Sequence, residues 1–342
     1  MKILYVGHPA HRWSGSSRFF QEILEKLGSV TYLAPTTITA EDDLLFALES
    51  DFDLYVFFQF DFMAYAFLHA GKNVLVVPMV DGSGGFGLRH WRLLKDAKFI
   101  TFSKNLDKFL KLQNMNTHNI QFWPKAQNYS KPTSEAVYFW PRIYDFPITV
   151  AEINRLFMGS VPITVRLLSD DPAEIDALGP LPETVNLKRI YSREEHIEEI
   201  KLSSVFIAPR KSEGIGLSFL EALSLGRPVI AYNYPVMSEY ILHGVTGVLL
   251  NSRSTVIDPY ADWEQMGRSA NKSVVTGREN YLQSIFGLEK YILSPFKKKK
   301  IKSIHKTLDL LNLSVKIYKE ETHINGNLSL NSFVRARPRI GI

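Results

Sequence analysis

The sequence contains no cysteine, which excludes disulfide bridges, thiolate nucleophiles and cysteine-ligated zinc. Its nine histidines do not show the H-E-x-x-H spacing of a zinc hydrolase. No run approaches the roughly 20 apolar residues that a membrane-spanning helix needs, and the first apolar run, Lys2–Gly7, is too short for a secretory signal. We therefore expect a cytoplasmic protein.

An excess of positive charge is absent outside the C-terminal tail. Residues 297–342 contain eleven Lys or Arg and three Asp or Glu, which leaves 29 basic and 32 acidic side chains in residues 1–296. Binding to a nucleic-acid backbone needs a basic face on the folded body. The body is mildly acidic, so we predict no nucleic-acid partner.

Short apolar runs alternate with helical patterns through most of the chain, which is typical of parallel sheets covered by helices on both faces. The length of 342 residues exceeds what one core usually holds, and a Pro-containing polar stretch at 124–134 reads as a linker. We predict an α/β fold with two doubly wound domains, at 1–130 and 131–280, then C-terminal helices at 281–322 and a loose tail at 323–342. The predicted strands are Ile3–Val6, Val30–Leu33, Leu54–Phe58, Val74–Val77, Phe99–Phe102, Ile120–Trp123, Ala136–Trp140, Ile163–Leu168, Val185–Leu187, Val205–Ala208, Val229–Tyr232 and Val248–Leu250.

The tail contains a basic amphipathic helix. Its apolar residues recur at steps of three and four and form one stripe: Ile301, Ile304, Leu308, Leu311, Val315 and Tyr318. Lysines flank this stripe. One interpretation is that the helix docks on the protein's own body or on a partner, and the other is that residues 297–320 contact an anionic membrane at its inner face.

The segment Val205–Ala231 carries the most chemical information. A strand ends near Ala208, a loop with Gly214 and Gly216 follows, and a helix begins near Leu217. The glycines allow a ligand to approach the backbone, and the helix start presents unpaired amides, so a diphosphate is the natural occupant. Two carboxylates, Glu213 and Glu221, flank this helix start and can contact different parts of one elongated ligand. An alternative is that Ser218 and Glu221 merely form a capping box.

This segment resembles the E-x7-E signature of the family 4 retaining glycosyltransferases, and the likeness extends through Pro228–Ala231, Ser238-Glu239 and His243–Gly247. The resemblance implies the GT-B fold, in which two Rossmann-like domains face each other across a cleft. The N-terminal domain then holds the acceptor and the C-terminal domain holds the nucleotide-sugar donor.

The resemblance also implies roles for individual residues. Glu213 contacts the donor sugar near the reacting carbon, Glu221 holds the ribose, and the amides of residues 215–217 meet the phosphates or the sugar. The implied catalytic residues are Glu213, Asp81 and Arg142. The implied donor-binding residues are Gly214, Ile215, Gly216, Leu217, Ser218, Glu221, Arg142, Lys211, Tyr191 and Gly15.

Two positions depart from the family pattern. Family members carry a Lys five residues after the Arg at position 142, where this chain has Pro147, and Arg210 or Lys211 could supply the missing cation. Only Gly15 remains of the usual glycine pair after the first strand. Separately, residues 82–87 satisfy the G-x-G-x-x-G dinucleotide pattern, but no acid ends the next strand, so a loop on the acceptor side fits better.

The expected activity is transfer of a sugar from a UDP- or GDP-linked donor to a saccharide or lipid-linked acceptor, with retained configuration and no bound metal. The expected context is the synthesis of cell-surface polysaccharide such as lipopolysaccharide or capsule. Two alternatives stay open: a nucleotide-sugar epimerase or phosphorylase on the same fold, and a nucleotide-binding protein that has lost catalysis.

Overall fold

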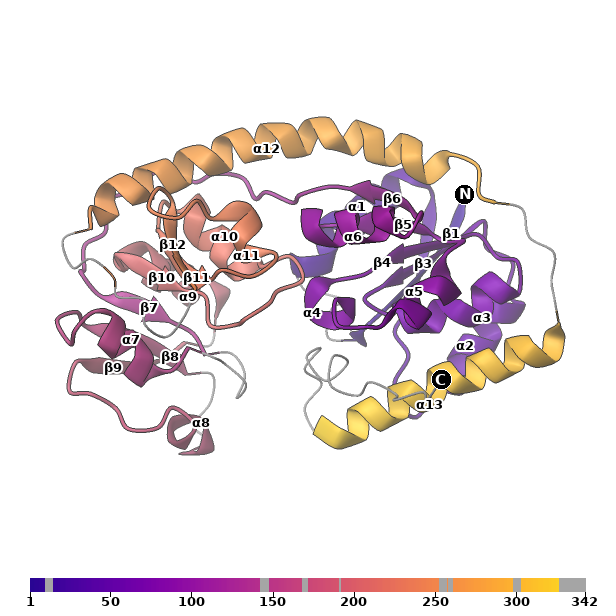
Figure 1. Cartoon of the computed structure of the whole chain (residues 1–342), viewed down its shortest axis with the longest axis horizontal. Coiled ribbons are helices and arrows are strands. Elements are labelled where there is room, and N and C mark those ends of the chain that lie inside the picture. The colour runs from indigo at the N-terminus through magenta and orange to yellow at the C-terminus, as the bar shows by residue number, and fades with distance from the viewer. Residues whose placement is uncertain are drawn as a thin grey trace. The chain divides into compact units, whose positions relative to one another are not determined.

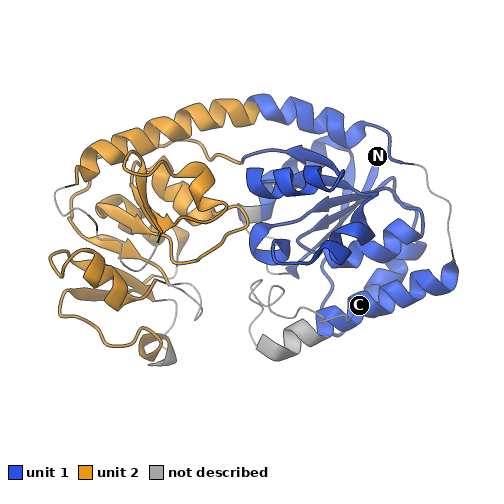
Figure 2. Ribbon diagram, viewed as in Figure 1, with its two compact units in different colours: residues 1–121, 283–342 blue, residues 122–282 orange. Residues whose placement is uncertain are grey.

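The chain folds into two compact units, which Figure 2 colours separately. Unit 1 comprises residues 1–121 and 283–342, and unit 2 comprises residues 122–282. The linker expected at 124–134 therefore lies inside unit 2, and the C-terminal helices group with unit 1. The computed structural model describes residues 1–9, 15–141, 148–167, 172–190, 192–251, 257, 261–297 and 303–325.

Unit 1 contains a six-stranded sheet in which every described strand pair is parallel. Its spatial order is β2-β1-β3-β4-β5-β6. The strands are β1 (Lys2–Gly7), β2 (Ser29–Leu33), β3 (Leu54–Phe58), β4 (Val74–Val77), β5 (Lys98–Thr101) and β6 (Asn116–Asn119). The chain reverses its direction of winding between β1 and β3, and in open α/β sheets ligands bind beyond the strand ends at such a point.

Helices cover both faces of this sheet (Figure 1). Strands β3 and β4 are buried along their whole length, so both consist of continuous apolar residues. The sequence therefore predicted both strands correctly. The helical segments are α1 (Gly15–Leu27), α2 (Ala40–Glu49), the 3-10 helix η2 (Asp61–Met63), α3 (Ala64–His69), α4 (Val80–Ser83), α5 (Leu88–Leu94) and α6 (Lys104–Leu112).

One predicted strand was wrong. Residues 120–123 have no strand structure, and the sixth strand, β6, is the polar segment just before them. Ile120 and Phe122 are nevertheless buried, which explains why they resembled a strand. β6 pairs only with β5 at the edge of the sheet, where partly exposed Asn, Thr and His side chains are tolerated.

Unit 2 repeats the parallel arrangement in the order β12-β11-β10-β7-β8-β9. Its winding reverses between β7 and β10, which pair directly with each other. The strands are β7 (Val137–Phe139), β8 (Ile163–Leu167), β9 (Val185–Arg189), β10 (Val205–Ile207), β11 (Val229–Tyr232) and β12 (Gly247–Leu250). The helices between and after them are α7 (Val150–Leu156), α8 (Pro172–Asp176), α9 (Arg193–Leu202), α10 (Leu217–Ser224) and α11 (Met237–Tyr240).

A long helix, α12 (Trp263–Leu293), begins in unit 2 and ends in unit 1. Lys98 of β5 is 2% exposed, and its ammonium donates to the carbonyl oxygens of Tyr291 at 2.9 Å and Ile292 at 3.2 Å. The last carbonyls of a helix have no partner within it and carry negative partial charge. The buried lysine therefore caps the C-terminal end of α12.

The last helix, α13 (Ile304–Asn325), packs on unit 1 against α2 and α3. Leu311, Val315 and Tyr318 are buried, whereas Ile304 is 70% exposed and Leu308 is 39% exposed. Polar contacts fix the same face: Ser314 Oγ donates to Phe62 O at 3.0 Å, and Tyr318 OH donates to Pro35 O at 2.8 Å. Docking on the protein's own body is thus confirmed for the second half of the predicted stripe. No helix among the described residues is both long and apolar enough to cross a membrane.

Candidate functional site

The site begins where the chain leaves β10 at the winding reversal of unit 2. The loop ends at Gly216, which is the N-cap residue of α10 with φ 78° and ψ 44°. This left-handed conformation favours glycine. A Cβ at Gly216 would also lie 1.9 Å from the ring of Phe219, so no other residue fits without movement.

The start of α10 has no N-cap side-chain hydrogen bond. The first main-chain bond of the helix runs from Leu220 N to Gly216 O at 3.1 Å, so the amides of residues 217–219 precede the hydrogen-bonded ladder. No side chain caps the helix at Gly216. The capping-box interpretation of Ser218 and Glu221 is therefore wrong: Ser218 is the second residue of the helix, not its N-cap.

Glu221 instead pairs with Arg193, whose Nη2 lies within hydrogen-bonding reach of Oε1. A true capping box lies at α9: Ser192 Oγ accepts from Glu195 N, and Glu195 Oε2 accepts from Ser192 N, both at 3.1 Å. This box fixes the first turn of α9, from which Arg193 reaches Glu221. Residues 192–195, which directly follow the predicted donor-binding Tyr191, are thereby tied to the second acid of the motif.

Glu213 is more buried than Glu221. Its side chain is 7% exposed and forms an ion pair with Arg210, with Nη1 3.1 Å from Oε2. Charges removed from water are tolerated only when they are paired. The Arg210 guanidinium and the Glu213 carboxylate are therefore buried as a pair in the loop just before α10.

Lys211, the other candidate for the missing cation, does not share the buried position of Arg210 and Glu213. Its residue is exposed, and its ammonium lies 5.5 Å from the centre of the Tyr234 ring. With Arg210 and Arg193 each paired to a glutamate, the described acids and arginines of the motif are electrically balanced. Among the described residues of this segment, the amides at the start of α10 and Lys211 are then the groups best placed to attract an anion such as a phosphate.

The remaining predicted residues are distributed between the units. Glu213, Gly214, Ile215, Gly216, Leu217, Ser218 and Glu221 form one contiguous stretch of unit 2 around the start of α10. Asp81 and Gly15 belong to unit 1. Arg142 and Tyr191 lie outside the described residues, as does Pro147.

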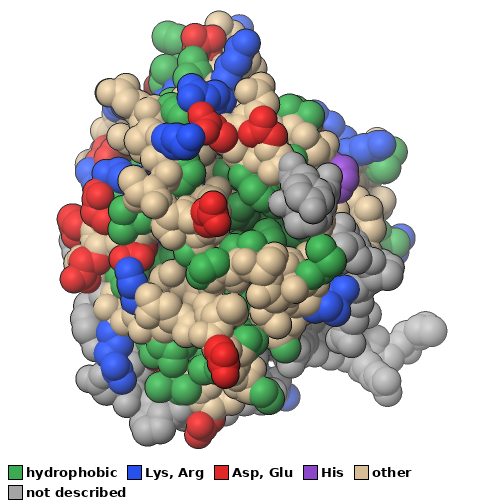
Figure 3. All heavy atoms as spheres, turned by 90° about the vertical axis from the view of Figure 1, so that its left-hand side faces the viewer, with side chains coloured by type: hydrophobic (Ala, Val, Ile, Leu, Met, Phe, Trp, Pro, Cys, Tyr) green, Lys and Arg blue, Asp and Glu red, His purple; other side chains and the backbone are tan. Residues whose placement is uncertain are grey.

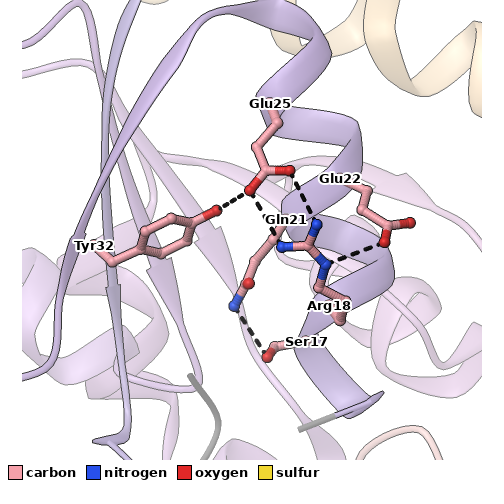
Figure 4. Close-up of polar contacts among 6 residues, drawn as sticks. All are labelled: Ser17, Arg18, Gln21, Glu22, Glu25 and Tyr32. Carbon is pink, nitrogen blue, oxygen red and sulfur yellow. Dashed lines mark hydrogen bonds and ion pairs between the residues drawn. The ribbon is translucent and has the colours of Figure 1, made fainter. Parts of the chain in front are cut away.

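Gly15 is the first residue of α1. The basic side chain nearest to it on this helix, Arg18, is committed to the helix itself, as Figure 4 shows: its guanidinium binds Glu22 at 3.1 Å and Glu25 at 3.4 Å. Tyr32 of β2 also donates to Glu25, at 2.6 Å. Arg18 is therefore paired with acids of its own helix.

Asp81 lies in α4 just after β4 and is 3% exposed. Two residues along this helix, Ser83 donates from Oγ to Asp61 Oδ1 at 2.6 Å. Asp61 in turn pairs with His90, and both are buried. Sequence reasoning missed Asp61 and His90, although Asp61 follows β3 much as Asp81 follows β4, and the carboxyl ends of parallel strands lie along one edge.

Among the described residues, no group of three or more His, Asp or Glu is arranged to hold a metal ion. Metal independence stays a prediction. On the face that Figure 3 shows, grey atoms aside, basic, acidic and apolar side chains are intermixed. That face gives no support to a nucleic-acid partner.

A family model described as glycosyl transferases group 1 matches residues 173–266, which include the whole stretch from Glu213 to Glu221. No curated protein matches the chain by sequence.

Solved structures resemble the chain over most of its length. Alr3699/HepE from Anabaena, in complex with UDP and glucose, has a TM-score of 0.62 at 14% identity and covers 86% of this chain and 100% of its own. The sucrose-phosphate synthase tll1590 from Thermosynechococcus elongatus has a TM-score of 0.64 at 13% identity, over 85% and 98%. AviGT4, a glycosyltransferase involved in avilamycin A biosynthesis, has a TM-score of 0.57 at 11% identity, over 85% and 97%. The predicted fold, two parallel-sheet α/β domains of the GT-B kind with C-terminal helices, is confirmed.

Proposed function

We propose that this protein is a retaining glycosyltransferase that transfers a sugar from a nucleotide-diphosphate donor to a saccharide or glycolipid acceptor. The observation that carries the proposal is the start of α10: Gly216 in a left-handed conformation leaves three amides ahead of the helix ladder, between Glu213 and Glu221. Helix starts of this kind bind phosphate groups. The match to the glycosyltransferase group 1 model over 173–266 supports the assignment, as does the UDP-glucose complex known for the structurally similar HepE.

The proposed reaction breaks the bond between the anomeric carbon and the β-phosphate oxygen, and the electron pair leaves with the diphosphate. The acceptor hydroxyl oxygen bonds to the anomeric carbon on the face that the diphosphate leaves, and its proton passes to the departing phosphate oxygen. The α10 amides stabilise the growing phosphate charge, an effect whose loss costs about 2.7–4 kcal/mol per donor. Glu213 faces the sugar, Glu221 holds the ribose together with Arg193, and Arg142 adds positive charge.

No resident metal is needed in this scheme, because amides and cations neutralise the diphosphate directly. Asp81 is proposed to contact the acceptor. The acceptor belongs to cell-surface polysaccharide synthesis, and the basic segment 297–320 brings the enzyme to an anionic membrane surface. Since Leu311, Val315 and Tyr318 are packed on unit 1, the membrane contact depends on lysine charge and not on insertion of that apolar face.

A second candidate is a protein that binds the donor without turning it over. It is favoured by the Pro147 that replaces a lysine in the sequence and by the pairing of Arg210 with Glu213, because both leave less cationic charge for the leaving group. A third candidate, an epimerase or phosphorylase, shares the donor site and differs in its products.

The test has two stages. A thermal-shift screen against UDP, GDP, ADP and their sugars identifies the donor, because a ligand at 100 times its Kd stabilises the native state by about 2.7 kcal/mol. Product analysis with and without saccharide acceptors then separates transfer from hydrolysis or epimerisation. Glu213→Gln should lower transfer by about 100-fold or more. Full activity in this variant, or no thermal shift with any nucleotide, would contradict the proposal.

A further inference from the structure

Arg210 and Glu213 form a buried ion pair at the centre of the donor site. Their side chains are 9% and 7% exposed, and Nη1 lies 3.1 Å from Oε2. The residues are three apart in the loop between β10 and α10, so the contact is local in sequence. Lys211, the intervening cation next to Arg210, is exposed, which shows that burial of a positive charge here is specific to Arg210.

Burial makes the orientation of Glu213 depend on its partner. A carboxylate removed from water is stabilised when an opposite charge lies within a few ångströms. The planar guanidinium supplies this charge and also restricts the direction in which the carboxylate points, which an ammonium does less well. Without Arg210, Glu213 would be free to turn away from the sugar.

The same pairing argues against a direct phosphate role. A guanidinium already bound to a carboxylate presents a nearly neutral pair to an incoming diphosphate, which weakens its attraction for the phosphates. The exposed Lys211 keeps its full charge in solvent. The pairing therefore argues against Arg210 as the cation that compensates for Pro147.

We propose that Arg210 is a positioning residue that holds the Glu213 carboxylate oriented towards the donor sugar, and that it is not a ligand of the diphosphate. This inference rests on the proposed function. It predicts that Arg210 and Glu213 act as one unit: loss of either removes the same contribution, and loss of both removes it only once.

The experiment measures the Kd of UDP, which lacks the sugar, and the kcat of UDP-glucose hydrolysis and transfer. The variants are Arg210→Gln, Arg210→Lys, Glu213→Gln and the double variant Arg210→Gln/Glu213→Gln. Arg268→Gln is the matched control, since Arg268 forms an exposed pair with Glu264 at 2.8 Å in the same unit. The double variant retains no unpaired buried charge, so it separates loss of function from failure to fold.

We expect Arg210→Gln to leave the Kd of UDP within about threefold while kcat falls by roughly 100-fold, as in Glu213→Gln. The double variant should be no slower than the slower single variant, and Arg210→Lys should recover about tenfold in kcat by restoring the charge. Arg268→Gln should match the unaltered protein.

Three results would overturn the inference. They are a UDP affinity at least tenfold weaker in Arg210→Gln, losses in kcat that multiply in the double variant, and full turnover in Arg210→Gln. If the unaltered protein neither binds UDP nor turns over UDP-glucose, the proposed function also fails for a UDP-glucose donor. If the unaltered protein turns over UDP-glucose normally but the losses in kcat multiply in the double variant, only the proposed role of Arg210 is overturned.

Discussion

His90 Nε2 lies 2.6 Å from Asp61 Oδ2 in the interior of unit 1. The same carboxylate accepts from Ser83, and Tyr65 pairs with the other ring nitrogen of His90. Asp61 follows β3 at the winding reversal of the sheet, whereas Ser83 ends the short helix that carries Asp81. This buried network therefore anchors the proposed acceptor-side residue to the sheet.

Replacing Asp61 by Asn should destabilise unit 1 by about 1–3 kcal/mol, because it disturbs the buried hydrogen bond from Ser83 and the contact with His90 and leaves buried polar atoms without a matched partner. Urea denaturation measures the change. Asp42→Asn, at an exposed position of α2, should stay within about 0.5 kcal/mol of the unaltered protein. Equal effects of the two substitutions would show that the network contributes nothing specific.

Gly216→Ala should both destabilise unit 2 and weaken UDP binding. The new Cβ would meet the Phe219 ring at 1.9 Å in a backbone conformation with φ +78°, so the turn has to move and the α10 amides move with it. Gly179→Ala is the control, since Gly179 has φ +73° but no atom within 4 Å of its added Cβ. Backbone strain alone costs about 1–3 kcal/mol. A UDP affinity unchanged in Gly216→Ala would argue that the phosphates bind elsewhere.

Leu311→Ala should destabilise the protein by about 2–5 kcal/mol, the usual cost of removing a buried leucine side chain. Leu308, one turn earlier on α13, is 39% exposed, and Leu308→Ala should cost much less. Thermal or urea unfolding of the two variants measures the difference. If α13 instead left the body to lie on a membrane, the two leucines would affect stability in water equally little.

Stability should fall as the pH rises above 10. Burial raises the pKa of Tyr5, Tyr138 and Tyr240 above the ordinary value for tyrosine, so these hydroxyls stay protonated in the folded protein when the unfolded chain loses its protons. A raised pKa of this kind contributes stability below pH 10 that is lost at higher pH, by up to about 1.4 kcal/mol per pH unit for each group.

The measurement is the urea midpoint between pH 8.5 and 11. Surface lysines titrate in the same range, so the comparison is between the unaltered protein and Tyr5→Phe. The variant should show a shallower decline above pH 10, because one of the three hydroxyls no longer contributes. Parallel curves would mean that Tyr5 ionises in the fold as readily as in the unfolded chain.

The sequence located the fully buried strands and the turn at Gly216 because those features are local. A continuous apolar run predicts a strand covered on both faces, and two glycines before an apolar helix predict a close approach to its first amides. It failed at β6, where an edge strand is polar and the apolar residues after it are buried without being a strand. An apolar run indicates that its residues are buried, but buried residues do not always form a strand.

The structure was needed to find the partners of both motif acids, Glu221 and Glu213. For Glu221 it shows a contact between two helices, and for Glu213 it shows which neighbouring cation is buried. Arg193 and Glu221 are 28 residues apart and meet because α9 and α10 pack together. Arg210 and Glu213 are close in sequence, yet only the fold could show that this arginine is buried against the acid while Lys211 is exposed.

By itself, the sequence determined the two-domain α/β architecture and the position of the glycine turn before α10, because both depend on apolar periodicity and on glycine at a helix start. Tertiary structure alone decided that Asp61 pairs with His90, that Gly216 and not Ser218 is the N-cap of α10, and that half of the α13 stripe is buried on unit 1. These contacts join residues whose separation in the chain is large or whose burial depends on packing, and no local pattern of residues encodes them.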